Sequence, residues 1–312
     1  MKNSAVNLSM LGIGMAILAA MLWGTTGTAQ SMASGATSPY WTGALRLAFS
    51  CGFFLVLIFY KRFRQAPHSA DVCAQRPTPL KQKPYLATVL IAGTCMGLYN
   101  LSFFSGVKAT GIAIGTAAAI GSAPIWAGLL QALITRKAPP WLWWAGTLCA
   151  TAGGIWMVLS QATPWQFDPK GLALCLSAGL TYAIYTLVSK RLLKMASPLT
   201  ITSHTFGIAA LIAIPAAWLL TGPLSITQSD WLIMLYLGVA ATGISYLLFT
   251  QALKHISAAT GVALALFEPI TAFVLAIVVV GEPVQAWAFA GLCLILAGLV
   301  LVLRTEMHAT TV

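Results

Sequence analysis

The sequence FEPI at 267–270 is a second copy of SAPI at 122–125, and each copy is followed at equal spacing by two alanine–glycine pairs. The copies are 145 residues apart at Pro124 and Pro269, and the same 145 residues separate both glycine positions. Those positions are Gly146 with Gly291 and Gly153 with Gly298. The duplication divides the chain into two similar halves, which we place at 1–160 and 161–312.

The composition indicates a membrane protein. Of the 312 residues, 59% are hydrophobic and 7% are charged, whereas soluble domains average about 25% charged residues. The net charge of +11 does not indicate a nucleic-acid partner, because the basic residues flank apolar spans. The six cysteines form no CxxC pair, so we expect neither a disulfide framework nor a metal site. No cofactor is expected either.

Ten apolar segments have the length of a membrane-spanning helix, which needs about 20 residues. Their limits are 9–30, 40–60, 85–106, 111–134, 141–159, 171–189, 199–220, 231–251, 258–279 and 285–303. The first segment can also be interpreted as a signal peptide, but it continues through small residues to Ala33 and has a counterpart in the second half, which favours a retained helix. The predicted fold is therefore all-α, an integral membrane protein with ten transmembrane helices.

The basic residues set the orientation. With the N-terminus in the cytoplasm, 14 Lys and Arg residues fall in cytoplasmic segments, and only Lys108 and Lys170 fall in outer loops. Cytoplasmic loops carry such an excess, and an even number of helices places both termini in the cytoplasm. Because five helices per half is an odd number, the two repeats must be inverted. Inverted repeats are a common architecture of secondary transporters, whose substrate site lies near the bilayer midplane.

The loops agree with this inversion. Arg136-Lys137 follows the fourth segment, whereas Gly281-Glu282-Pro283 follows the ninth, so matching loops carry opposite charge. The loop Lys61–Pro84 is the longest, with four prolines and six basic residues. We expect it to be a flexible cytoplasmic linker.

The order and spacing of several motifs resemble the EamA-type repeat of the drug/metabolite transporter superfamily. The second half has GVAATGISY at 238–246, LFEPI at 266–270 and GEP at 281–283, and the first half has LWGTT at 22–26 and API at 123–125. The resemblance covers nearly the whole chain and extends to YddG-like amino-acid exporters of bacterial inner membranes. It implies that helices 1, 3, 4, 6, 8 and 9 line a central cavity, that helices 5 and 10 pack away from it, and that helix 2 is peripheral.

Glu268 is the only carboxylate placed well inside a span. An ionisable group at that depth is costly and by default suggests a functional site. Glu268 either contacts a substrate ammonium or carries protons, or it is a protonated structural group bonded to a carbonyl that Pro269 leaves free. Pro124 and Pro269 are candidate hinges.

Aromatic and polar residues on the expected cavity helices are further candidates. Rings with a hydroxyl or N–H group suit an amphipathic ligand, although each such residue can equally pack between helices. Tyr182 and Tyr185 are three residues apart and can share a helix face. The candidate substrate-binding residues are Trp23, Thr26, Tyr99, Asn100, Tyr182, Tyr185, Tyr246 and Glu268.

Arg46 lies several residues inside the second span. It either holds a substrate carboxylate or extends to the interface near Tyr40 and Trp41, and the peripheral second helix of the family favours the interface. We expect His204 to be an interfacial polar residue. The seven-residue spacing of the paired glycines, which is two helical turns, predicts helix packing.

We therefore predict a secondary transporter that exports small amphipathic metabolites, above all amino acids including aromatic ones, by alternating access. The alternative is a multidrug or other metabolite efflux carrier of the same superfamily. The chain is not expected to be an enzyme, because it has no HExxH, no GxSxG and no pair of intramembrane aspartates. A channel is not expected, because it needs a ring of repeated polar groups and one Glu does not supply it. An ATP-driven pump is not expected either, because it needs a P-loop, and the sequence has none. The expected partners are a small-molecule substrate and the lipid bilayer, with proton coupling left open.

Overall fold

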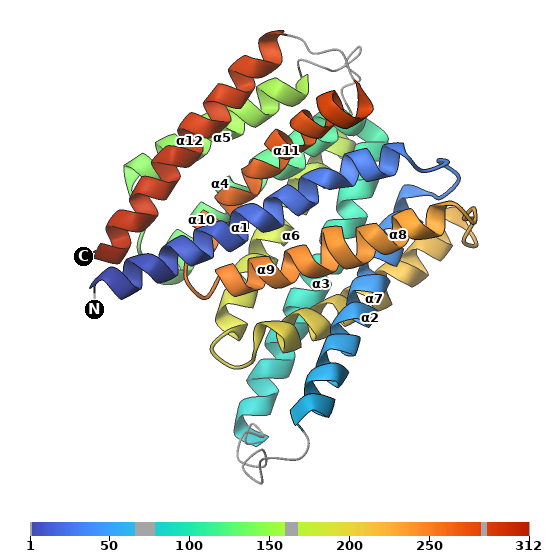
Figure 1. Ribbon diagram of the computed structural model, residues 1–312, viewed down its shortest axis with the longest axis horizontal. Coiled ribbons are helices and arrows are strands. Elements are labelled where there is room, and N and C mark those ends of the chain that lie inside the picture. The colour runs from blue at the N-terminus through green and yellow to red at the C-terminus, as the bar shows by residue number, and fades with distance from the viewer. Residues whose placement is uncertain (1, 66–78, 160–167, 282–285, 312) are drawn as a thin grey trace.

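A computed structural model describes residues 2–65, 79–159, 168–281 and 286–311, and these residues form a bundle of helices (Figure 1). The first seven spans are α1 (Lys2–Ser31), α2 (Pro39–Gln65), α3 (Pro79–Thr110), α4 (Ile112–Thr135), α5 (Trp141–Leu159), α6 (Pro169–Leu192) and α7 (Pro198–Thr221). The eighth span comprises α8 (Asp230–Gly238), η2 (Val239–Ile244) and α9 (Ser245–Ala252). The ninth comprises α10 (Ala258–Leu264), η3 (Ala265–Phe267), α11 (Glu268–Leu275) and η4 (Ala276–Val280), and α12 (Ala286–Thr311) is the tenth.

The ten-helix prediction is confirmed. Within the described ranges, nine helices are long and apolar enough to cross a membrane, and α5, with 19 residues, is the tenth. Local signals set several helix starts. Asp168 and Ser197 accept backbone N–H groups at the beginning of α6 and α7, and a proline that needs no such acceptor follows each of them.

The two halves are arranged as inverted repeats around the centre of the bundle. Helix α5 contacts its counterpart α12 along one edge, and α2 contacts its counterpart α7 along the opposite edge (Figure 1). Between these edges, α1 packs against α9 and α11 of the second half, and α6 packs against α3 and α4 of the first. The space between the halves is therefore surrounded by helices of both repeats.

The contact between α5 and α12 depends on the duplicated glycines. A Cβ atom added to Gly153 would lie 2.6 Å from the carbonyl oxygen of Gly291, and one added to Gly146 would lie 2.7 Å from that of Gly298. The two backbones approach closely because neither helix has a side chain at these positions. The prediction that these glycines serve helix packing is confirmed.

The eighth and ninth spans are not regular helices. Val239–Ile244 and Ala276–Val280 are π-helical, and a 3₁₀ turn at Ala265–Phe267 directly precedes Glu268. Pro269 has no N–H group to donate to the preceding turn, which favours a change of helix type there. Pro124, by contrast, lies inside the continuous helix α4.

The limits expected for the longest loop, Lys61–Pro84, are wrong at both ends. Helix α2 continues to Gln65, with Arg62 and Arg64 in its last turn, where cations interact favourably with the helix dipole. Helix α3 already begins at Pro79 and contains Pro84. Residues 66–78, like Glu282 and Pro283 of the loop after the ninth span, lie outside the described residues.

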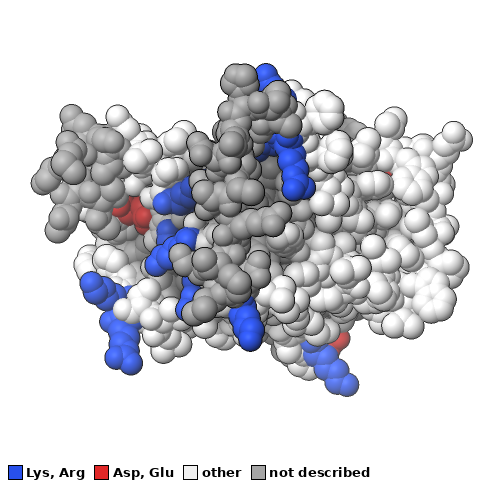
Figure 2. All heavy atoms as spheres, turned by 90° about the horizontal axis from the view of Figure 1, so that it is seen from below, with Lys and Arg blue, Asp and Glu red and all other residues white. Residues whose placement is uncertain are grey.

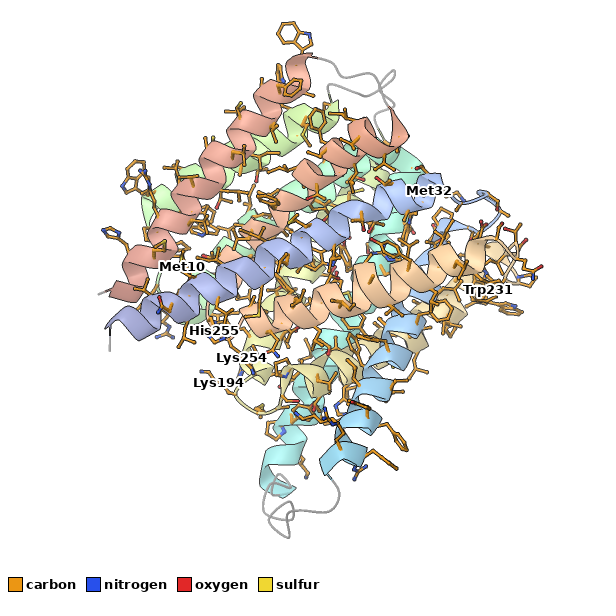
Figure 3. The ribbon with its side chains drawn as sticks, in the orientation of Figure 1. Met10, Met32, Lys194, Trp231, Lys254 and His255 are labelled. Carbon is orange, nitrogen blue, oxygen red and sulfur yellow. The ribbon has the colours of Figure 1, made fainter. Side chains whose placement is uncertain are left out.

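Basic residues gather at one end of the bundle. Figure 2 shows the Lys and Arg side chains over the left and middle of one face, whereas the right part is mostly uncharged. Helix α1 begins and α12 ends at the same side (Figure 1). Lys194 and Lys254 lie toward that side, and Met32 and Trp231 lie at the opposite one (Figure 3).

Candidate functional site

A cavity of about 360 Å³ lies between the two halves. Its walls come from α1, α2, α3 and α4 of the first half and from α6, α7, η2, α9, α10, η3 and α11 of the second. Within the described chain, neither α5 nor α12 contributes a lining residue. The cavity helices implied by the family resemblance are therefore present, and α2 and α7 join them.

The cavity occupies the half of the bundle away from the chain termini. On α1 its wall runs from Trp23, which is buried, to Gln30, which is exposed near the end of that helix. On α2 the wall begins at the exposed Pro39 and continues inward to Leu47. The cavity thus begins at the end marked by Met32 in Figure 3 and ends near the middle of the bundle.

Seven of the eight candidate substrate-binding residues line this cavity: Trp23, Thr26, Tyr99, Asn100, Tyr182, Tyr246 and Glu268. Tyr185 is not part of the lining. Its side chain is 1% exposed, and its ring packs 6.1 Å from Tyr182 and 6.0 Å from Tyr246. Three residues along a helix rotate a side chain by roughly 60° relative to the first position, which turns Tyr185 behind the wall that Tyr182 forms.

Aromatic rings from four helices close the inner end of the cavity. The ring of Trp23 lies 4.9 Å from that of Tyr246 and meets Tyr182 edge-on at 6.4 Å. Tyr99 continues the cluster at 5.4 Å from Tyr182. Such rings provide apolar surface with polar groups at their edges, so this end of the cavity suits a ligand with a flat or apolar side chain.

Four polar atoms of the cavity wall lack a well-oriented hydrogen-bond partner among the described residues. The Nε1 of Trp23, the Oγ1 of Thr26, the Oδ1 of Asn100 and the hydroxyl of Tyr182 are buried without a well-oriented hydrogen bond from the described residues. An unpaired buried polar atom costs about 1–3 kcal/mol. A ligand with its own donors and acceptors would relieve this cost, and the cavity is therefore prepared for a polar group beside its aromatic rings.

Glu268 contributes the only carboxylate among the described residues that line the cavity. It is the first residue of α11, is half-buried, and accepts no hydrogen bond from the described part of the chain. Gly24 of α1 packs directly on its backbone, because a Cβ atom there would lie 2.6 Å from the carbonyl oxygen of Glu268. Glu268 and Trp23 line the same cavity, next to this close approach of α1 and α11.

Arg46 is the lining residue that sequence reasoning placed elsewhere. Its Nε donates a hydrogen bond of 3.0 Å to Oγ1 of Thr242, and its side chain lines the cavity instead of extending to the interface. Helix α2 packs along α8 and η2, so the inward face of α2 belongs to the site. The sequence signal, a cation inside an apolar span, was present, but the peripheral second helix of the family suggested the wrong direction.

The lining thus contains opposite charges. Arg46 and Glu268 face the same cavity and lie within electrostatic range of each other. They do not form a direct ion pair in the described structure. Among the described residues no contacting side chain neutralises either charge, so each remains available to a charged group inside the cavity.

His204, expected from the sequence to be an interfacial polar residue, lies outside this site. Nδ1 of His204 is 2.8 Å from the hydroxyl of Tyr85, and neither residue lines the cavity. The described residues contain no group of three or more His, Cys, Asp or Glu side chains that could hold a metal ion.

Comparison with known proteins identifies a transporter family and a shared fold. The model of the EamA-like transporter family matches residues 10–159 and 169–304. The chain is 35% identical over 286 residues to the uncharacterized transporter YwfM of Bacillus subtilis, a match that covers 92% of this chain and 91% of that protein. An uncharacterized transporter of Archaeoglobus fulgidus is 27% identical over 203 residues, 65% of this chain and 71% of that protein. One crystal structure, at 19% identity, superposes with a TM-score of 0.75 over 99% of each chain and shares the fold.

Proposed function

The chain belongs to the EamA-like transporter family, and on this premise we propose that it is a secondary carrier that exports amino acids, aromatic ones included, across a bacterial inner membrane. The substrate binds in the cavity between the two five-helix halves, 1–160 and 161–312. Rocking of one half against the other then exposes the cavity to either side in turn.

The observation that carries this proposal is the combination of Glu268, the aromatic rings and the unpaired polar atoms in one cavity. The carboxylate of Glu268 suits a substrate ammonium, and the rings of Trp23 and Tyr182 suit an apolar side chain. A volume of about 360 Å³ falls at the lower end of the range for small-molecule sites, about 300–1,000 Å³. Small amphipathic metabolites meet all three requirements.

The orientation of the chain decides toward which side of the membrane this cavity lies. With both termini in the cytoplasm, as the excess of basic residues at that end favours, the cavity lies toward the outer side and the aromatic cluster lies on its cytoplasmic side. The 3₁₀ turn before Pro269 and the π-helical segments of the eighth and ninth spans are places where the wall can bend. We include Pro124 and Pro269 as hinges, and Glu268 as a residue that can also carry a proton.

A multidrug carrier of the same superfamily is the second candidate. Aromatic rings around a carboxylate also suit a lipophilic cation, and Trp23 and Glu268 provide that pair. The cation of Arg46 in the same cavity opposes it, because a like charge repels such a substrate.

Transport by the purified protein tests the proposal. Proteoliposomes are loaded with labelled phenylalanine, methionine or threonine, and exchange is measured for wild type, Glu268→Gln and Asp168→Asn. Asp168 lies at the start of α6 and outside the cavity lining, and asparagine preserves its capping role. We expect saturable wild-type transport, a loss on the order of tenfold or more in Glu268→Gln, and an unchanged rate in Asp168→Asn. If no amino acid is carried while lipophilic cations are, the proposal is wrong and the drug carrier is favoured.

A further inference from the structure

We propose, on the basis of the function proposed above, that Arg46 binds the carboxylate of the transported amino acid and that Thr242 positions Arg46 for this task. The second helix then belongs to the substrate site. The carrier would accept substrates that bear a carboxylate and reject amines that lack one.

The hydrogen-bond donors of Arg46 support this assignment. A guanidinium group has five N–H donors, and only the one on Nε is used, toward Thr242. The four N–H groups on the terminal nitrogens have no partner among the described residues, and the side chain lines the cavity. Two parallel N–H groups at the end of a guanidinium match the two oxygens of a carboxylate.

Thr242 holds Arg46 in a defined direction. Thr242 lies in the π-helical segment η2, and its hydroxyl donates to the carbonyl oxygen of Leu237, five residues earlier, at 2.7 Å. Because the single hydroxyl hydrogen is used in this way, the oxygen can only accept from Arg46. Thr242 is buried, so its hydroxyl is a fixed acceptor. The Nε edge of the guanidinium is therefore occupied, and the edge of terminal nitrogens is left for a ligand.

The charges of the cavity point to the same substrate. An uncompensated cation inside a membrane protein is costly, and Arg46 has only an uncharged direct partner in Thr242. Glu268 faces the same space without contacting Arg46. An amino acid between them neutralises both charges at once, with its carboxylate at Arg46 and its ammonium at Glu268. Its side chain then lies against the rings of Trp23, Tyr99 and Tyr182.

The competing interpretation is that Arg46 only ties α2 to η2 through Thr242 and balances Glu268 at a distance. The two interpretations differ in what they predict for a substrate without a carboxylate. Phenylalaninamide retains the ammonium and the ring of phenylalanine but has a neutral amide in place of the carboxylate, so it isolates the contribution of that group.

The experiment measures uptake of labelled phenylalanine, and its inhibition by phenylalaninamide, in proteoliposomes that contain wild type, Arg46→Gln, Thr242→Val or Thr242→Ser. We expect phenylalaninamide to inhibit the wild type at least tenfold more weakly than unlabelled phenylalanine. In Arg46→Gln the KM for phenylalanine should rise at least tenfold, and the difference between the two inhibitors should disappear. Thr242→Val should show a smaller rise of the same kind, and Thr242→Ser, which keeps the hydroxyl, should behave like wild type.

Each result decides between the interpretations. Equal inhibition of the wild type by both compounds would overturn the assignment, even if Arg46→Gln fails to fold. An unchanged KM in Arg46→Gln, with only a lower maximal rate, would make Arg46 a structural tie. These outcomes leave the proposed function intact, because the wild type still carries phenylalanine, whereas a wild type that carries no amino acid contradicts the proposed function itself.

Discussion

The ammonium group of Lys190 donates a hydrogen bond of 2.6 Å to the carbonyl oxygen of Ile256 and so ties α6 to the turn between α9 and α10. The same group donates to the carbonyl oxygen of Leu253 at 2.9 Å. From α12, the carboxylate of Glu306 accepts the N–H of Ser257 at 2.7 Å. Side chains from both ends of the second half thus hold this turn at the end of the bundle opposite to the cavity mouth.

Replacing Lys190 by methionine should loosen this end of the bundle. Methionine keeps much of the apolar length of the side chain but removes both hydrogen bonds to carbonyl groups, and a hydrogen bond from a charged group contributes about 1.5–3 kcal/mol. We expect a lower thermal unfolding midpoint in detergent for Lys190→Met. Lys194→Met is the control, because Lys194 lies one turn further along and its side chain makes no hydrogen bond in the described structure. Equal midpoints for the two variants would show that the tie does not stabilise the fold.

The crossing of α5 and α12 gives a second prediction, with its control one residue away. Gly153→Ala places a Cβ atom 2.6 Å from the carbonyl oxygen of Gly291, whereas the nearest atom to a Cβ on Gly154 is 4.0 Å away, on Leu266. Overpacking of this kind costs about 1–3 kcal/mol, and alanine at an uncrowded helical position is neutral or stabilising. Thermal unfolding should therefore separate the variants, with Gly153→Ala below wild type and Gly154→Ala at or above it. A reversed order would contradict the close contact.

Much of this fold could be predicted from the sequence because hydropathy and glycine spacing are local signals. The ten apolar segments correspond to ten helical spans, and the spaced glycine pairs lie at the contact of α5 with α12. The π-helical segment Val239–Ile244 could not be predicted in this way. Its apolar residues are equally compatible with a regular α-helix, and the two differ in the backbone hydrogen-bond pattern of the folded helix.

The candidate site, too, could be predicted only in part. Seven of the eight candidate substrate-binding residues line the cavity, and they lie on helices that the family resemblance implies. Tyr185 does not line it, because the rotation of α6 about its axis is set by packing and not by spacing. For Arg46 the peripheral second helix of the family favoured the interface, and a single sequence does not reveal which face of α2 meets η2. Both differences concern the direction in which a side chain points, and tertiary contacts decide that direction.

Gly24 gives a prediction about the geometry around Glu268. A Cβ atom on Gly24 would lie 2.6 Å from the carbonyl oxygen of Glu268 and 2.6 Å from Cβ of Thr271, so Gly24→Ala should push α1 away from α11. The transport rate should fall, because Trp23 and Glu268 would no longer hold the same ligand. Gly14→Ala is the control on the same helix, since nothing lies within 4 Å of a Cβ there. Equal transport by both variants, at equal amounts of folded protein, would show that transport does not depend on the close contact between α1 and α11.

The neighbouring tyrosines of α6 provide the most direct test of which ring faces the substrate. Tyr182 lines the cavity and its hydroxyl has no well-oriented partner in the described structure, whereas Tyr185 is packed behind it. Tyr182→Phe and Tyr185→Phe each remove one hydroxyl from the same helix, so they are matched in chemistry and differ in position. We expect Tyr182→Phe to raise the KM for transported amino acids by roughly threefold to tenfold, the effect of about one lost hydrogen bond, and Tyr185→Phe to leave KM unchanged. The decisive measurement is the KM of both variants for one substrate in proteoliposomes. A larger effect at Tyr185 would mean that the working cavity extends behind Tyr182 during transport.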